Sequence, residues 1–270
     1  MVEYFLSLNP VYQALVATTI TWLATALGAS VVFFTKRLNR KFMDALLGFA
    51  AGVMIAASFW SLLAPGIDMA KELGMNPWLT AAFGFLSGGI LMRIVDKLLP
   101  HLHPDLFHSP EGIKTSWRRS VLVVTAVTLH NIPEGFAIGV MFGAIASSAG
   151  SVTVASAVIL AIGIGIQNIP EGAAVSMPLR REGVSRWKSF VIGQYSGLVE
   201  PVAGVLGAIF VINMREMLPF ALCFAAGAMM FVVIEELIPE AQNDKTNVDV
   251  VTMVTLIGFA VMMILDVAFT

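Results

Sequence analysis

Eight apolar stretches follow one another along the chain, and short polar connections separate them. A helix needs about 20 apolar residues to cross the hydrocarbon core of a bilayer, and each stretch is long enough. The pattern therefore predicts an all-α polytopic membrane protein in which residues 1–270 form a single eight-helix transmembrane domain. The predicted spans are residues 9–35, 42–64, 76–99, 117–146, 152–179, 186–213, 216–239 and 249–269.

The composition agrees with this pattern. The chain is 57% hydrophobic and only 13% charged, with a mean hydropathy of +0.84. Soluble domains carry roughly 25% charged residues, so a soluble globular protein is excluded. The formal net charge of −2, without any basic block, gives no reason to expect a nucleic-acid partner. Cys223 is the only cysteine, which rules out an intramolecular disulfide and a Cys-rich metal site. Residues 1–10 lack the basic start of a removable signal peptide.

Lysine and arginine fall mainly on one side of the predicted membrane. Loops on the cytoplasmic side carry an excess of these residues. The loops after spans one, three, five and seven hold thirteen of them, against two on the other side. Both termini should therefore lie outside, and residues 100–116 should form a cytoplasmic loop. That loop carries His101, His103 and His108, and short His-containing tracts can bind metal, so a regulatory or releasing role stays open.

The sequence Asn-Ile-Pro-Glu-Gly occurs twice, at residues 131–135 and 168–172. A carboxylate at the centre of a membrane helix costs about 2.5–3.5 kcal/mol, and intramembrane ionisable residues are usually functional. Spans four and five are consecutive, so they run antiparallel and their shared motif is an inverted repeat. Many transporters place such a repeat around a binding site at the membrane midplane.

The two motifs offer metal ligands with helical spacing. His130 and Glu134 are four residues apart, so they lie on one helix face, and Gln167 and Glu171 repeat that spacing. Imidazole, carboxylate and amide oxygen together suit divalent transition metals. Pro133 and Pro170 each free a backbone carbonyl and bend the helix, which alone could be a purely structural device. The candidate metal ligands of these two spans are His130, Asn131, Glu134, Gln167, Asn168 and Glu171.

A third intramembrane carboxylate, Glu200, precedes Pro201 near the middle of span six. Three carboxylates with one histidine favour a site that binds and releases a cation. A divalent-metal carrier is the leading hypothesis, and a metal-selective channel on the same site is an alternative. An intramembrane metal-dependent hydrolase is less favoured, because such sites usually need two or three histidines. We therefore expect no enzyme activity and no resident cofactor, only transported metal.

These residues resemble the paired signatures of the ZIP (Zrt/Irt-like) metal transporters, most closely the bacterial GufA-like branch. The resemblance covers the whole chain and rests on residues 130–135 and 167–172. It implies a midplane metal site, sometimes binuclear, with Glu200 as a further ligand, a thioether ligand at Met54 and a pathway residue at Ser61. Met54 alone would be read as a core or lipid-facing residue.

The same resemblance implies how the protein works. It implies transport toward the cytoplasm by an elevator-type movement of one helix group against another. It also implies a possible homodimer, the bacterial inner membrane, and zinc as substrate, with cadmium, iron or manganese possible. Some members have His in place of Gln167 and Asp in place of Asn168. We therefore expect one strong metal position and a second that is weaker or transient.

Other polar residues admit two readings each. Asp68, at the outer end of span two, is either a solvated cap or a ligand of an entrance funnel. The acidic residues at the cytoplasmic ends of spans three and seven form either an exit relay or a plain acidic rim: Asp96, Glu235, Glu236 and Glu240. Gly84 and Gly88 in span three could form a dimer face or pack tightly within the bundle.

Overall fold

The computed structural model describes residues 2–35, 39–99, 119–146, 152–212 and 214–270, and every regular element in these ranges is helical. The α-helices are α1 (Val2–Ser7), α2 (Pro10–Ala29), α3 (Arg40–Ala57), α4 (Ala64–Glu72), α5 (Pro77–Leu98), α6 (Arg119–Ala146), α7 (Val154–Arg181), α8 (Arg186–Tyr195), α9 (Val199–Ile212), α10 (Leu218–Val232), α11 (Ile238–Ala241) and α12 (Val248–Phe269). Short 3₁₀ segments are η1 (Ser30–Phe33), η3 (Ser196–Leu198) and η4 (Arg215–Met217), and η2 (Ser58–Leu63) and η5 (Val233–Leu237) are π-helical turns.

Polar caps start the long helices where the hydrophobic pattern predicts them. The Asn9 and Asn76 side chains each accept a hydrogen bond from a backbone N–H of the first turn, and a proline follows each of them. Asn39 caps α3 in the same way, and Thr153 forms a capping box with Ser156 at the start of α7. Asparagine and threonine stabilise helix starts because they satisfy backbone donors that lack a helical partner.

The described residues contain seven helical stretches long and apolar enough to cross a membrane. They are Pro10–Phe33, Arg40–Glu72, Pro77–Leu98, Val154–Arg181, Arg186–Ile212, Leu218–Ala241 and Val248–Phe269. The prediction of an all-α integral membrane protein is therefore confirmed. The second stretch continues well past the predicted end of span two. Helix α6 is a further long helix, with 28 residues, at the place of predicted span four.

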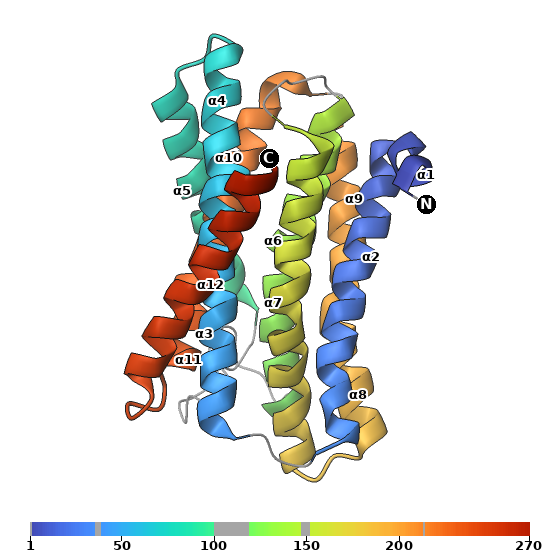
Figure 1. Ribbon diagram of the computed structural model, residues 1–270, viewed down its shortest axis with the longest axis vertical. Coiled ribbons are helices and arrows are strands. Elements are labelled where there is room, and N and C mark those ends of the chain that lie inside the picture. The colour runs from blue at the N-terminus through green and yellow to red at the C-terminus, as the bar shows by residue number, and fades with distance from the viewer. Residues whose placement is uncertain (1, 36–38, 100–118, 147–151, 213) are drawn as a thin grey trace.

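The helices pack in two groups (Figure 1). The first helix group comprises α2, α6, α7, α8 and α9, and its main pairs are α6 with α9 and α2 with α7. The second helix group comprises α3, α4, α5, α10, α11 and α12, in which α3 packs on α12 and α5 on α10. The groups meet mainly where α3 contacts α7 and α10 contacts α6. Spans one, four, five and six thus form one group, and spans two, three, seven and eight form the other.

Glycines bring the backbones into contact inside each group. A Cβ built on Gly28 of α2 would lie 1.9 Å from the Ile169 carbonyl oxygen on α7, and one on Gly52 of α3 would lie 1.9 Å from the Thr255 carbonyl oxygen on α12. Between the groups, a Cβ on Gly163 would instead meet the side chain of Met262. Small residues permit this close approach of membrane helices. Each group is therefore joined backbone to backbone, whereas side chains fill the boundary at Gly163.

The two readings of Gly84 and Gly88 can now be separated. A Cβ on Gly84 would lie 2.7 Å from the Cβ of Cys223, and one on Gly88 would lie 2.0 Å from the Phe224 carbonyl oxygen. Both partners belong to α10, so these glycines pack within the second helix group. Cys223 is fully buried at this contact, as expected for a core thiol.

Prolines coincide with departures from regular α-helix. The π-turn η2 ends two residues before Pro65, and the π-turn η5 ends two residues before Pro239. A π-turn shifts backbone hydrogen bonds, and such turns occur often at functional sites. By contrast, α6 and α7 continue as helices through Pro133 and Pro170. The distorted turns place Ser61 in η2 and Glu236 in η5.

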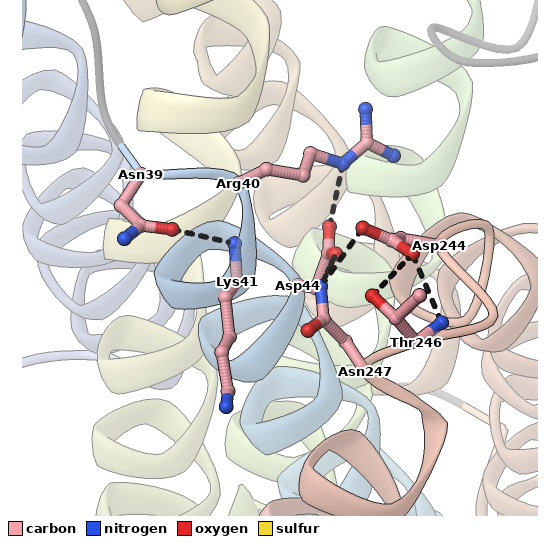
Figure 2. Close-up of polar contacts among 7 residues, drawn as sticks. All are labelled: Asn39, Arg40, Lys41, Asp44, Asp244, Thr246 and Asn247. Carbon is pink, nitrogen blue, oxygen red and sulfur yellow. Dashed lines mark hydrogen bonds and ion pairs between the residues drawn. The ribbon is translucent and has the colours of Figure 1, made fainter.

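A polar clamp joins the start of α3 to the connection between α11 and α12 (Figure 2). The buried Asp44 accepts hydrogen bonds from Arg40 Nε at 2.8 Å and from Asn247 Nδ2 at 3.1 Å. Asn247 also donates to Asp244. Thr246 donates to Asp244 from its backbone N–H and its hydroxyl, which holds the pKa of that carboxyl below its usual value. Asp244 therefore stays charged at neutral pH, and the clamp fixes one end of the second helix group.

Candidate metal centre

The two Asn-Ile-Pro-Glu-Gly motifs lie in the middle of α6 and α7, and their polar side chains point away from solvent and lipid. Glu134, Gln167 and Asn168 are fully buried, and Glu171 is 4% exposed. A Cβ on Gly135 would lie 2.4 Å from the Glu200 carbonyl oxygen, so α9 passes directly beside this part of α6. The missing side chain of Gly135 thus allows the third carboxylate, Glu200, to join the other two.

The carboxylates of this centre lie within electrostatic range of one another. Glu134 interacts with Glu171 and Glu200, and Glu171 interacts with Glu200 and also with Glu236 and Glu240. All belong to elements of the two helix groups that meet here. Like charges placed together in a buried site repel one another unless a cation or protons neutralise them. The cluster is therefore suited to a divalent cation.

Six buried oxygens at this centre accept no hydrogen bond from the described residues. They are both carboxylate oxygens of Glu134 and of Glu171, the amide oxygen of Asn131 and the amide oxygen of Gln167. An unpaired buried oxygen is costly, and most buried polar atoms in proteins have a partner. Six such atoms on two adjacent helices mark a place where a ligand supplies the missing partner.

Acidic, histidine and cysteine side chains alone do not complete a metal site. Among the described residues, no three of these side chains converge closely enough to hold an ion. The Gln167 side chain, however, lies next to the Glu134 carboxylate. Amide oxygens suit the same range of divalent metals as carboxylates, so those of Gln167 and Asn131 are candidate ligands beside the carboxylates.

Glu200 differs from the other two carboxylates because both of its oxygens have partners. Its Oε1 accepts from Asn168 Nδ2 at 2.9 Å, and its Oε2 accepts from the Thr21 hydroxyl. Thr21 comes from α2, so three helices of the first group meet at this carboxylate. Thr21 could not be predicted as a partner of Glu200, because a threonine in an apolar span ordinarily bonds its own helix.

His130 lies between the central carboxylates and the second helix group. Its Nε2 contacts Glu236 Oε1, and both side chains are less than 10% exposed. Glu236 belongs to the π-turn η5, so the pair crosses the boundary between the groups. A metal ion bound through Nε2 would compete with this contact, because imidazole ligates a metal through a free nitrogen lone pair.

The structure also shows where Met54 and Ser61 lie. Met54 is 1% exposed on α3, the helix that packs against α7. Ser61 donates a hydrogen bond to Asp266 of α12, with 2.8 Å to Oδ1 and 3.0 Å to Oδ2. Asp266 is a buried carboxylate that the sequence analysis overlooked. It lies inside predicted span eight, but its partner Ser61 is 205 residues away in the sequence, so the pair could not be recognised from local spacing.

The remaining acidic candidates divide by their surroundings. Asp68 has a 59% exposed side chain and pairs with Lys71 at 2.7 Å. Asp96 and Glu235 both pair with Arg93, on the side of the second helix group formed by α5. Glu240 lies four residues after Glu236, and both interact electrostatically with Glu171. His101, His103 and His108, in the predicted loop 100–116, lie outside the described residues.

A comparison of the sequence with known protein families gives a match over most of the chain. The family model described as ZIP Zinc transporter matches residues 11–117 and 108–266. The chain belongs to the ZIP family. The resemblance inferred from the paired motifs is thereby confirmed.

Individual ZIP relatives align with nearly the whole chain. Zinc transporter ZIP11 of Xenopus tropicalis is 40% identical over 330 aligned residues, which cover 96% of this chain and 98% of the relative. Zinc transporter GufA of Myxococcus xanthus is 35% identical and covers 94% of this chain and 98% of its own length. Zinc transporter ZIPB of Bordetella bronchiseptica is 37% identical over an alignment that covers 91% of this chain and 77% of the relative. The relatives of this ZIP chain thus include the bacterial GufA branch predicted from its motifs.

Proposed function

We propose that this protein transports divalent transition-metal ions across the membrane toward the cytoplasm, with zinc as the main substrate. The observation that carries the proposal is the set of six buried oxygens on α6 and α7 that lack hydrogen-bond partners among the described residues, four of which belong to the Glu134 and Glu171 carboxylates. The relatives named as zinc transporters support zinc, and cadmium, iron and manganese suit the same ligands. The transported ion is a substrate, not a resident cofactor.

The binding site in this proposal is made by α6 and α7. Glu134 and Glu171 supply two negative charges, which a divalent cation neutralises. The oxygens of Gln167 and Asn131 complete the set, and His130 adds a nitrogen when its contact with Glu236 opens. Met54, in the helix beside α7, is a candidate thioether ligand. Because amide oxygens are neutral and weaker ligands than histidine nitrogen, the site would release its ion readily.

The route proposed for the ion follows the predicted orientation, with eight spans and both termini outside a bacterial inner membrane. Figure 1 draws both chain ends toward one end of the bundle, and α8 and α11 toward the other. The second end includes the basic residues around α8, so it would face the cytoplasm. Glu236 and Glu240 would then guide the ion from Glu171 toward the cytoplasm, whereas Ser61 and Asp266 lie in the half nearer the termini. Asp68, Asp96 and Glu235 stay as weaker candidates.

We propose that transport proceeds by alternating access, in which the first helix group moves against the second. Backbone contacts at glycines stiffen each group, while side chains fill the boundary at Gly163. The predicted inverted repeat of spans four and five would put the moving site near the midplane. A channel on the same residues is the competing hypothesis, and the relatives' names disfavour a hydrolase. A homodimer stays a prediction.

Uptake by reconstituted vesicles tests the function directly. Purified protein in vesicles should take up zinc above the level of protein-free vesicles, with a rate that saturates as the external concentration rises. Cadmium, iron and manganese should compete with zinc to different degrees. A rate equal to that of protein-free vesicles for all four metals would refute transport, and a rate linear in concentration would favour a channel.

Cross-linking tests the movement between the two helix groups. Phe136 of α6 contacts Phe224 of α10 in the second group, with 6.1 Å between ring centroids, and Phe210 of α9 in its own group, with 6.5 Å. We expect a short bifunctional thiol reagent to stop zinc uptake in the Phe136→Cys/Phe224→Cys variant. The Phe136→Cys/Phe210→Cys variant should keep its uptake after the same treatment. Equal uptake by both cross-linked variants would contradict movement at this boundary.

A further inference from the structure

Two of the three central carboxylates lack hydrogen-bond partners among the described residues, and the third has a partner on each oxygen. Both oxygens of Glu134 and of Glu171 lack hydrogen-bond partners among the described residues. Glu200, by contrast, accepts one hydrogen bond on each oxygen, from Asn168 and from Thr21. It is fully buried, so no water replaces these partners at low cost. Glu200 is therefore already satisfied by the protein.

A backbone carbonyl fixes the direction of the hydrogen bonds in this part of the site. Asn168 Nδ2 lies 3.1 Å from the Thr21 carbonyl oxygen, which carries no proton and can only accept. The NH₂ group of Asn168 must therefore face Thr21 and Glu200. Its Oδ1 then faces the other way and accepts from Gln167 Nε2 at 2.7 Å.

The same chain of bonds decides which atom Gln167 offers to the centre. Because Gln167 Nε2 donates to Asn168, the free atom of the amide is its oxygen, and that oxygen has no partner. An ordered chain thus runs from Gln167 through Asn168 to Glu200, with Thr21 closing its far end. It leaves the Gln167 oxygen without a partner and directs donors of Asn168 and Thr21 toward Glu200.

We propose that this hydrogen-bond chain takes the place of a second metal ion, so that the centre binds a single ion and Thr21 is a positioning residue for Glu200. The proposal rests on the proposed function, since it assumes that Glu134 and Glu171 bind the ion. Glu200, which the sequence analysis placed among the ligands, here anchors α9 to α2 and α7. Asn168 gives Glu200 a neutral N–H donor in place of a second cation, and its other N–H donates to the Thr21 carbonyl.

The number of metal ions per chain tests the proposal. The probe is cadmium, measured at equilibrium on purified protein in detergent. The Glu134→Gln/Glu171→Gln variant serves as the blank, which removes any contribution of the loop histidines. After this subtraction we expect one ion for the wild type, one for Glu200→Gln, and two for Asn168→Asp. An aspartate cannot donate to Glu200 and adds a charge, so the second position should open.

The outcomes distinguish a failure of the single-ion proposal from a failure of the proposed function. Two ions in the wild type, falling to one in Glu200→Gln, would overturn the single-ion proposal even if Asn168→Asp fails to fold. One ion in a well-folded Asn168→Asp variant would also overturn it. A wild type that binds no more cadmium than the blank would instead refute the proposed function itself.

Thr21 has its own test with a matched control. Thr21→Val keeps the shape of the side chain but removes the donor to Glu200, so zinc uptake should fall about tenfold or more. Thr21→Ser retains the hydroxyl and should restore most of the rate. Thr18 is also buried on α2, but its hydroxyl bonds only carbonyls of its own helix, so Thr18→Val should behave as wild type. Equal rates for Thr21→Val and Thr21→Ser would overturn the role of Thr21.

Discussion

Replacing Glu171 by glutamine is expected to weaken metal binding by about a hundredfold or more and to reduce zinc uptake to near background. Glu171 is one of two carboxylates whose oxygens have no protein partner, and its variant removes half of the charge that balances a divalent ion. Even partners of metal ligands cost about 10–100-fold in affinity when they are lost, so a ligand itself should cost at least as much. Equilibrium binding of zinc and uptake by vesicles measure the two effects.

A control for this variant comes from the same helix. Glu182, the C-cap residue of α7, is exposed and stands outside the buried centre, so Glu182→Gln should bind and transport zinc as the wild type does. Normal uptake by Glu171→Gln would contradict the assignment of the site. Loss of uptake in both variants would show that the charge of α7, and not the site, controls the rate.

Replacing Gly172 by alanine is expected to destabilise the protein strongly, by about 3 kcal/mol. The new Cβ would lie 2.0 Å from the Thr25 carbonyl oxygen and 2.9 Å from the Ala29 backbone nitrogen. Both atoms are backbone atoms of α2, so the clash can be relieved only if α2 and α7 move apart. That movement would also separate the Thr21 carbonyl on α2 from Asn168 on α7. The fraction of protein that stays monodisperse on heating in detergent measures the loss.

Gly165, two turns earlier on α7, provides the matched control for Gly172. A Cβ there would meet only the methyl group of Thr21, at an ordinary distance of 3.8 Å. Gly165→Ala should therefore be tolerated, because alanine also favours helix more than glycine does. Equal heat stability of the two variants would show that α2 and α7 do not pack as closely as described.

Much of this fold follows from hydrophobic length and polar caps. The start of α5 at Asn76-Pro77 and of α2 at Asn9-Pro10 agrees with the predicted spans to within one or two residues. The extension of the second span was missed, because the hydrophobic pattern weakens around Pro65 while the π-turn η2 lets the helix continue into α4. Hydropathy contains no information about that change of hydrogen bonding.

The pairing of helices could not be predicted in the same way. Gly28 and Gly52 look alike in the sequence, yet one faces α7 and the other α12. Which backbones meet depends on surfaces far apart along the chain. The division into two helix groups therefore appears only in three dimensions.

The candidate site could be predicted where ionisable side chains interrupt an apolar span. Glu134, Glu171 and Glu200 are carboxylates in apolar spans, and the structure brings them into electrostatic contact. Thr21 and Asp266 were missed for physical reasons: a hydroxyl is inexpensive in a helix, and the partner of Asp266 is 205 residues away in the sequence. Their roles depend on partners from other helices, which sequence periodicity does not identify.

Counterflow of zinc in reconstituted vesicles tests whether an ion bound between Glu134 and Glu171 is carried by alternating access. Vesicles loaded with unlabelled zinc are diluted into a trace of labelled zinc. We expect the label to accumulate first above its equilibrium level, and the Glu134→Gln/Glu171→Gln variant to show no such overshoot. Label that only approaches equilibrium in the wild type, or an overshoot that persists in the double variant, would contradict this mechanism.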